Sequence, residues 1–477
     1  MLVGAMLVAC AAGGPAHADD LREALTMAYQ TNPTLNAARA NQRAVDEGVP
    51  IARAAGLPSL SGTASFTDFV KKSALSTSSP DHAVDVQANL SVPIYSGGAV
   101  KNSLRAAETR VDAGQADLRG SESGLFSSVV AAYLDVISGQ ALVGLNRNNV
   151  QVLETNLSAT RDRFEIGDLT RTDVAQSQAR LAIARGNLRT SEANLAATRE
   201  RYIQLVGKAP VDLAPPPPLP GMPASADDAE TTALDSNPDL IGARQRTKAA
   251  GFDTRVAGAG RLPKVSLFSG VDYTDYLGTL SVTGFPGTVP QRSTTSQAGV
   301  RATIPIFSGG LPAAQRRQAQ ARENAAQEQE IGVERAVVAS VRSAFSQWQA
   351  SLEVIQTNQT AVDAAALSLE GVRAENSVGN RTILDILNAE QELLNAQTQL
   401  VTARRNAYVA GFNLLSAMGK AEARDLGLDG GVLYDPEVNY QRVHAIIWDW
   451  STDPAPRPKA TRTVDTPVQD GSIPARQ

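Results

Sequence analysis

The chain contains 477 residues and has a formal net charge of −5 at pH 7, because 49 acidic side chains outnumber 44 basic ones. This balance excludes the basic surface by which nucleic-acid-binding proteins are recognised. Aromatic residues make up only 5% of the chain, so we expect long helices packed through small residues, and a length sufficient for two or three domains.

The first 18 residues have the pattern of a secretory signal peptide. They are small and apolar, and they end in Ala16-His17-Ala18, which resembles an A-x-A cleavage site. The basic segment that usually begins such a signal is missing, which suggests a start codon further upstream. An alternative is a lipoprotein signal ending at Cys10, although few residues precede it. Cys10 is the single cysteine of the chain, so its removal excludes disulfides and thiol chemistry.

The next elements alternate between helix and strand. Residues 20–53 are predicted to be helical, with Asn32-Pro33 producing a kink or a new start. Residues 59–70 alternate apolar and polar side chains as a strand does, residues 71–82 are a polar loop, and residues 84–92 are a second alternating strand. No apolar run of about 18 residues follows the N-terminus, so a membrane-spanning helix is not expected.

A junction then leads into a long helical hairpin. The junction reads Val92-Pro93-Ile94-Tyr95-Ser96-Gly97-Gly98, and its two glycines permit a tight bend from a tilted strand into a helix. Residues 98–164 carry a coiled-coil seam of apolar and small residues, and this helix would be roughly 100 Å long. Gly167 can end the helix, and Thr170 or Thr172 can cap a returning helix over residues 173–206.

This arrangement occurs twice. The second junction reads Ile304-Pro305-Ile306-Phe307-Ser308-Gly309-Gly310, and Pro93 and Pro305 are 212 residues apart. Gly167 and Gly379 keep the same offset, whereas the segments upstream of the strands are 205 residues apart. We interpret this as an internal duplication. The second copy predicts a helix over residues 227–257 and strands over residues 263–273 and 296–304.

The four strands require partners from other chains if their apolar face meets lipid. Four strands cannot close a barrel, and an open edge is not tolerated in a bilayer. Several chains must then share one barrel, whose polar face lines a wet lumen. Helices of roughly 100 Å exceed a hydrocarbon core of about 30 Å, so they must project into an aqueous compartment. The alternative is a soluble helical stalk that carries β-hairpins, but the repeated proline junction and the signal favour the barrel.

These junctions, together with the turn Ser377-Val378-Gly379-Asn380-Arg381-Thr382-Ile383-Leu384-Asp385, resemble the TolC-like outer-membrane efflux proteins. The resemblance covers residues 20–420. It implies a mainly α fold with a β-barrel part: a homotrimer with a twelve-stranded outer-membrane barrel, four strands per chain, continued by a periplasmic coiled-coil tunnel. It also implies a Gram-negative source and a periplasmic adaptor and an inner-membrane ABC or proton-driven transporter as partners, besides outer-membrane lipid, with no cofactor, metal or nucleic acid.

The same resemblance assigns the domains and the function. The signal peptide covers residues 1–18, the first repeat 19–223 with a proline-rich linker at 215–223, the second repeat 224–420, and a C-terminal periplasmic segment with a disordered tail 421–477. The expected function is an outer-membrane channel of a tripartite export system, which passes secreted protein or small molecules and is gated at the hairpin tips. The alternative is a periplasmic adaptor or stalk without a pore.

In this family the tip residues hold the tunnel shut. The positions that match are Thr172 and Asp173 at the first tip, and Arg381 and Asp385 at the second. A guanidinium close to the Asp173 carboxylate would form a charge-assisted hydrogen bond between neighbouring hairpins, and three copies of Asp385 would form an acidic ring. The alternative is that Arg381 and Asp385, four residues apart, only pair locally at a helix start.

Three features depart from the best-known members or refine the class. Asn388 stands where a second acidic ring residue occurs, and Asn376 stands where an aromatic gate residue occurs. The segment Leu433-Tyr434-Asp435-Pro436 with the later Asp449-Trp450 resembles members that serve type I protein secretion.

An enzyme is not indicated: His82 and His444 lie in a loop and in the tail, and Glu122 occupies the centre of the nearest G-x-S-x-G-like sequence.

Overall fold

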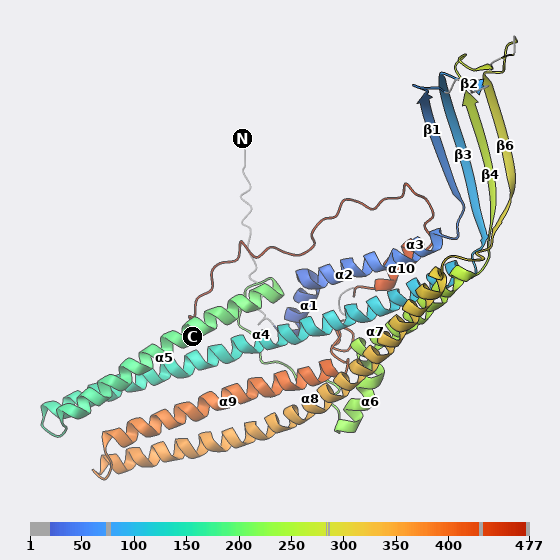
Figure 1. Ribbon diagram of the computed structural model, residues 1–477. Coiled ribbons are helices and arrows are strands. Elements are labelled where there is room, and N and C mark those ends of the chain that lie inside the picture. The colour runs from blue at the N-terminus through green and yellow to red at the C-terminus, as the bar shows by residue number, and fades with distance from the viewer. Residues whose placement is uncertain (1–19, 73–77, 283, 285–286, 429–432, 474–477) are drawn as a thin grey trace, which may run out of the picture.

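The computed structural model describes residues 20–72, 78–282, 284, 287–428 and 433–473, so the expected signal peptide and Cys10 lie outside the described residues. The molecule is elongated (Figure 1). A sheet stands at one end, two long helical hairpins extend to the other, and shorter helices lie along the middle. The sheet and the hairpins therefore occupy separate regions, as a barrel continued by a helical tunnel requires.

The N-terminal helical segment is three helices and not one. The elements are α1 (Leu21–Thr31), α2 (Pro33–Asp46) and α3 (Gly48–Ala54). Asn32 separates the first two, because its extended backbone ends α1 while its side chain accepts hydrogen bonds from the backbone of Thr34 and Leu35. Pro33 occupies the first helical position, where its missing N–H costs nothing. The prediction of a fresh start at this proline is confirmed.

The second repeat uses the same device. It begins with α6 (Ala226–Ser236) and α7 (Pro238–Gly258), which are followed by the short η1 (Ala259–Arg261). Asn237 caps α7 as Asn32 caps α2. The Nδ2 atom of Asn32 also donates to the carbonyl of Leu205 at 3.0 Å, and that of Asn237 donates to the carbonyl of Ala417 at 2.9 Å. The same residue thus ties each short helix to the end of its own hairpin, which confirms the duplication at the level of single contacts.

The sheet is antiparallel and its order is β1-β3-β4-β6. The strands are β1 (Ser59–Asp68), β3 (His82–Tyr95), β4 (Lys264–Asp275) and β6 (Arg292–Thr303). All four predicted strands exist, but β3 and β6 begin earlier than expected, and β3 continues through Pro93 with a register irregularity before Tyr95. A proline inside a strand is tolerated at such an irregularity. The two-residue strands β2 (Ser78–Ser79) and β5 (Ser281–Val282) pair with each other inside segments that were predicted to be loops.

Two long hairpins form the rest of the molecule. The first consists of α4 (Ala99–Glu165) and α5 (Arg171–Val206), and the second of α8 (Leu311–Ser377) and α9 (Ile383–Ala417). The helices α4 and α8 each contain 67 residues and start 212 positions apart. The predicted coiled-coil seam of α4 is buried at most positions, for example Val111, Leu118 and Leu125, whereas Ser121 is exposed.

The main hydrophobic core surrounds the middle of α4. Phe126, Val129 and Tyr133 are fully buried there against α1, α5 and α9. Among the described residues, α4 is the single helix that is long and apolar enough to cross a membrane. The apolar content of this helix serves the core, because the buried residues from Leu125 to Val143 belong to one packed cluster.

Burial differs sharply between the two long helices. The structure buries 21 residues of α4 but only four of α8. Because the two helices have the same length and equivalent places in the two repeats, the difference reflects their neighbours. Helix α7 of the second repeat packs against α4 and covers it. Helix α8, in contrast, lies at the edge of the molecule (Figure 1). The second repeat therefore presents a face that the chain itself leaves uncovered.

The C-terminal segment is attached to the first repeat. The helix α10 (Pro436–Val443) packs beside α2. Residues 452–473 contain neither helix nor strand, yet Nη1 of Arg199 donates to the carbonyl of Asp470 at 2.6 Å and the amide of Gln469 donates to Glu200 at 2.9 Å. These contacts attach residues 469 and 470 to α5, and the disorder expected of the tail stays a prediction. The proline-rich linker is also held, since the Tyr408 hydroxyl donates to the carbonyl of Pro217 at 2.9 Å.

Candidate functional site

One face of the sheet is apolar across all four strands. The register places Leu60 beside Leu90, and Val92 beside Leu267, which in turn pairs with Val300. These side chains are exposed to solvent in the single chain, with Leu60 at 75% and Val300 at 64% exposure. Water disfavours such a surface by about 25 cal/mol per Å². The face is thus built to meet an apolar environment or a partner.

The opposite face is polar. Its cross-strand rows contain Ser61 beside Asn89, and Thr63 beside Gln87, which in turn pairs with Asp272. Phe268 interrupts the pattern, and the Arg301 guanidinium lies over its ring at 4.8 Å from the centroid. The sheet is a single layer whose outer strands are exposed on both faces, so this polar face can line an aqueous space.

Within the described residues, the edge strands β1 and β6 each pair on one side only. Their outer backbone groups are unpaired in the single chain, and each such group costs several kcal/mol if it is buried in hydrocarbon. An apolar face with two open edges is therefore stable in a membrane only when strands from further chains complete the sheet. The sheet geometry confirms that one chain cannot close a barrel.

The strand-to-helix junctions contain the expected glycines in left-handed conformation. The φ angles of Gly97 and Gly98 are +64° and +81°, and those of Gly309 and Gly310 are +61° and +81°. Gly98 and Gly310 directly precede α4 and α8. At Gly97 an added Cβ atom would lie 2.8 Å from Cβ of Leu262, whereas at Gly309 it would meet nothing within 4 Å. The first junction is therefore packed, and the equivalent second junction is open.

The junction prolines differ in their surroundings. Pro93 pairs with Ser266 within the sheet, whereas Pro305 follows the end of β6 and lies outside any strand. Ile306 and Phe307 next to it are exposed at 94% and 87%. The second junction thus presents large apolar side chains that no described residue of the same chain covers.

The first hairpin tip is organised by a capping box. Gly167 has φ +84°, and the Thr170 side chain caps α5 by accepting the Asp173 amide, while Oδ2 of Asp173 accepts the amide of Thr170 at 2.9 Å and its hydroxyl at 2.7 Å. The side-chain and backbone hydrogen bonds from Thr170 hold the pKa of Asp173 below its ordinary value. Thr172 is exposed at the second position of the helix.

The second tip repeats this geometry. Gly379 has φ +83°, and Oδ2 of Asp385 accepts the backbone amide of Thr382 at 2.9 Å and its hydroxyl at 2.8 Å. These bonds lower the pKa of Asp385. Nε of Arg381 donates to Glu375 at 2.7 Å, so its ion pair is made with Glu375 and not with Asp385. In one chain the structure does not join Arg381 to Asp173, and a link between hairpins of neighbouring chains stays a prediction.

Sequence reasoning missed a buried link between the two hairpins. Glu390 on α9 is 6% exposed. Its carboxylate accepts hydrogen bonds from Nδ2 of Asn156 on α4 at 2.9 Å and from Nη2 of Arg373 on α8 at 3.0 Å. A signal was present, because Glu390 stands between Leu387 and Leu394 in an otherwise apolar seam. A charged residue at a seam position indicates a specific partner.

The departures from the family pattern also have partners. Oδ1 of Asn388 accepts a hydrogen bond from Arg180 on α5 at 3.0 Å, which adds a second link between the hairpins. Nδ2 of Asn376 donates to the carbonyl of Arg381 at 2.7 Å and so fixes the turn. In the tail motif, Asp435 caps α10 and the amide of Tyr434 donates to the Tyr29 hydroxyl at 2.8 Å. The motif therefore docks the C-terminal segment.

Within the described part of the chain, no group of three His, Cys, Asp or Glu side chains is placed to hold a metal ion. Glu122 lies inside α4, where it accepts the Ala423 amide at 2.6 Å, and the neighbouring Ser123 hydroxyl contacts that of Ser416 at 2.8 Å. These contacts join α4 to the end of the second hairpin.

Comparison with known proteins agrees with this geometry. The family model described as outer membrane efflux protein matches residues 24–208 and 231–420, one match in each repeat. The chain is 32% identical over 431 residues to the outer membrane efflux protein BepC of Brucella suis biovar 1, covering 90% of this chain and 92% of that protein. It is 27% identical over 423 residues to the outer membrane protein TolC of Escherichia coli K12, covering 86% and 84%.

A solved structure shows the same fold. The Campylobacter jejuni CmeC outer membrane channel superposes with a TM-score of 0.74 at 17% identity, and the match covers 89% of each chain. The single-layer sheet and the paired helical hairpins described above are thus shared with a membrane channel.

Proposed function

Because this chain belongs to the outer membrane efflux protein family, we propose that three copies form the outer-membrane channel of a tripartite efflux or type I secretion system. The sheets of the three chains join into one twelve-stranded barrel. The α4–α5 and α8–α9 hairpins continue the barrel as a tunnel through the periplasm. Substrate passes through the lumen and does not undergo chemistry in it.

The observation that carries this proposal is the incomplete sheet. It is apolar on one face and polar on the other, and both of its edges are open within the described residues. Joining β6 of one copy to β1 of the next satisfies the edge hydrogen bonds and directs every apolar face outward. The three-fold arrangement of the copies would also place a neighbouring chain beside α8 and beside the second junction, which are the parts that the single chain leaves uncovered.

Oligomeric state and conductance test the proposal directly. The purified protein in detergent should migrate as a heat-sensitive trimer on a denaturing gel and should insert into a planar bilayer with discrete conductance steps. A stalk or adaptor without a pore would migrate as a monomer on the gel both with and without heating, or would be found in the soluble or inner-membrane fraction. Absence of conductance from a folded trimer would reject the channel.

The hairpin tips are the surfaces that we assign to the partners. They lie at the end of the molecule opposite to the sheet (Figure 1), which places them furthest from the outer membrane. An adaptor and an inner-membrane transporter would engage the turns at Gly167 and Gly379, because a substrate must enter the tunnel at that end.

We assign the closure of the tunnel to Thr172, Asp173, Arg381 and Asp385. Both carboxylates use Oδ2 for their capping boxes, which leaves Oδ1 available to a donor on a neighbouring hairpin. Arg381 is the donor that we propose, since its guanidinium is half-exposed and makes one ion pair in the chain, with Glu375. Three copies around the axis would give three such links.

Replacing Arg381 by serine tests this assignment. An exposed ion pair is worth about 0.2–1 kcal/mol, so the loss of three should shift the closed state measurably towards open and raise single-channel conductance. Arg163→Ser is the matched control, because Arg163 forms a tip ion pair with Asp168 at the equivalent turn and has no assigned gate role. Equal conductance in Arg381→Ser and wild type would remove the gate assignment but leave the channel intact.

A further inference from the structure

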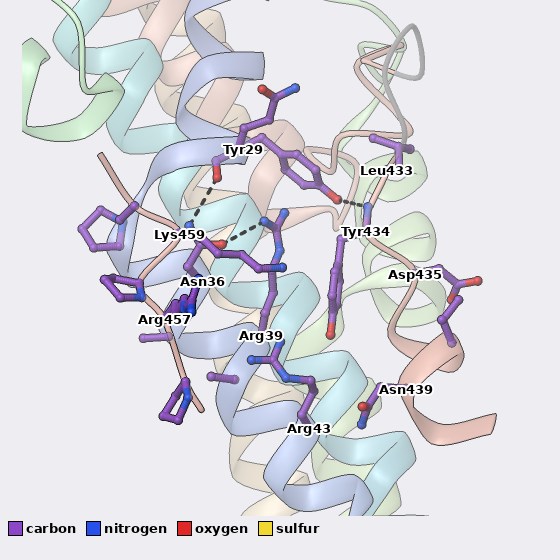
Figure 2. Close-up of a pocket in the computed structure, with 18 of the residues that line it drawn as sticks. Tyr29, Asn36, Arg39, Arg43, Leu433, Tyr434, Asp435, Asn439, Arg457 and Lys459 are labelled. Carbon is purple, nitrogen blue, oxygen red and sulfur yellow. Dashed lines mark hydrogen bonds between the residues drawn. The ribbon is translucent and has the colours of Figure 1, made fainter. Parts of the chain in front are cut away.

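A cavity of about 1100 Å³ lies away from the lumen face and the hairpin tips. Its walls come from α1 and α2, from the segment around α10, and from tail residues 456–460. Figure 2 shows the tail with Arg457 and Lys459 on one side of α2, and Tyr434, Asp435 and Asn439 on the other. The cavity therefore exists only because the C-terminal segment folds back over the first repeat.

The lining is strongly cationic. Among the described residues it contains five basic side chains and one acidic side chain: Arg39, Arg43, Arg442, Arg457, Lys459 and Asp435. Arg442 is neutralised by Asp453 at 2.7 Å, and Asp435 is engaged in capping α10. Within the described residues no carboxylate lies within ion-pair distance of the other four cations. Such a concentration of like charge is destabilising by itself, as the i, i+4 pair of Arg39 and Arg43 on α2 illustrates.

Arg39 provides the second observation. It is 8% exposed, and its guanidinium lies 4.3 Å from the ring centroid of Tyr29 and 5.0 Å from that of Tyr434, as Figure 2 shows. Nη1 donates to Asn36 at 3.3 Å, but Nη2 and the Tyr434 hydroxyl are both buried without a hydrogen-bond partner. Buried polar groups without partners are costly and uncommon. Two of them in one cationic cavity indicate a missing acceptor.

The carboxylate of Glu122 does not supply that acceptor. Glu122 on α4 interacts electrostatically with Arg39, but its hydrogen bond is made with the Ala423 amide. Burial raises the pKa of Glu122. Because that hydrogen bond goes to the Ala423 amide, Glu122 does not pair directly with the Arg39 guanidinium.

We propose that this cavity binds a ligand with two or more anionic groups, either carboxylates or phosphates. One group would be accepted by Arg39 and the Tyr434 hydroxyl, and the other by Arg43 together with Arg457 or Lys459 from the tail. Because these cations come from both α2 and the tail, the bound ligand would tie the C-terminal segment to the first repeat.

The position of the cavity excludes a lipid headgroup as the source. Arg39 and Ala54, which lies at the base of the sheet, are 15 positions apart along α2 and α3, and this corresponds to a helical rise of about 22 Å. The headgroup layer beyond the hydrocarbon core is only about 5–8 Å thick. The ligand is therefore a soluble polyanion or an acidic peptide of the surrounding aqueous compartment.

Calorimetric titration of the full-length protein in detergent tests the proposal. Pyrophosphate and triglutamate are the two probes, titrated at constant ionic strength so that general screening is equal. The double variant Arg43→Gln/Lys459→Gln removes two exposed cations of the cavity, and Lys101→Gln/Arg424→Gln removes two exposed cations elsewhere. We expect at least tenfold weaker binding, about 1.4 kcal/mol, in the first variant and wild-type affinity in the second.

The outcomes separate the possible sources. Binding of pyrophosphate alone identifies a phosphate ligand, binding of triglutamate alone identifies a carboxylate ligand, and in either case the cavity variant must lose it. Equal affinity in the two double variants would overturn the proposal, because the binding would then be non-specific. Absence of binding by both probes below about 1 mM would overturn it as well. Conductance is expected to be unchanged in both variants, so failure here leaves the channel function untouched.

Discussion

Removing the Glu390 carboxylate should loosen the contact between the two hairpins of each chain. Glu390 is almost fully buried and accepts hydrogen bonds from Asn156 at 2.9 Å and from Arg373 at 3.0 Å. Since Asn156 lies on α4 and the other two residues lie on α9 and α8, the network joins the first hairpin to the second. Glu390→Ala abolishes all of these bonds in each copy.

The magnitude follows from the burial of the partners. A hydrogen bond to a charged group contributes about 1.5–3 kcal/mol. The Arg373 side chain is 51% exposed, so water recovers much of its loss and its share is at the low end. The less exposed Asn156 recovers less. We therefore expect a cost of about 2–3 kcal/mol per chain, a factor of roughly 30–150 in the equilibrium between linked and separated hairpins.

Two measurements check this expectation. Single-channel recording should show a higher open probability for Glu390→Ala than for wild type, and hydrogen exchange should show lower protection around this position in α9. Glu392→Ala is the matched control, since Glu392 is an exposed acidic residue of the same helix. In a double-mutant cycle, Asn156→Ala should add little to Glu390→Ala because both remove one link. Wild-type exchange and gating in Glu390→Ala, or full additivity, would refute the reasoning.

Three further perturbations test separate parts of the account. Hydrogen bonds from the helix N-cap lower the pKa of Asp385 below its ordinary value of 3.8. Its contribution to the stability of the first turn of α9 is therefore full above that pH and is lost on acidification through the folded pKa. Hydrogen-exchange protection at the start of α9 should fall in that pH range in the wild type, but not in Asp385→Asn. Val86→Lys on the apolar face should reduce the yield of trimer, because a lysine facing lipid destabilises a barrel by up to about 2–4 kcal/mol at the membrane midplane. Gln87→Lys on the polar face should be tolerated. Gly97→Ala and Gly309→Ala both strain a left-handed backbone position. Equal losses of trimer in the two variants would show that a neighbouring copy covers Gly309, and a smaller loss of trimer in Gly309→Ala would contradict this.

Periodicity predicted the large elements well because their spacing is long and regular. The coiled-coil seam located α4 to within one residue at each end, and the 212-residue offset placed α8, its turn and its returning helix. Proline and asparagine correctly marked the start of α2, but Glu47, which separates α2 from α3, gave no equally clear signal. The two-residue strands β2 and β5 could not be foreseen, because their pairing joins loops from different repeats.

The candidate site was only partly accessible from the sequence. The junction glycines were identified because few other residues permit their left-handed backbone. Asp173 and Asp385 were singled out as gate residues, which stays a prediction, and the structure shows that the T-x-x-D spacing places both in capping boxes. The Glu390 network was missed because it depends on how α9 rotates against α4. The contacts between chains could not be predicted either, because they depend on how the copies are placed relative to one another.

The central claim is that identical chains complete one pore by sharing strands. Its most direct test is a disulfide between the two open edges, with one cysteine introduced in β1 and one in β6 of a chain whose Cys10 is replaced. Under oxidation the account predicts covalent trimers that still conduct ions in a planar bilayer. Cross-links confined to single chains, or a folded and conducting monomer, would contradict it.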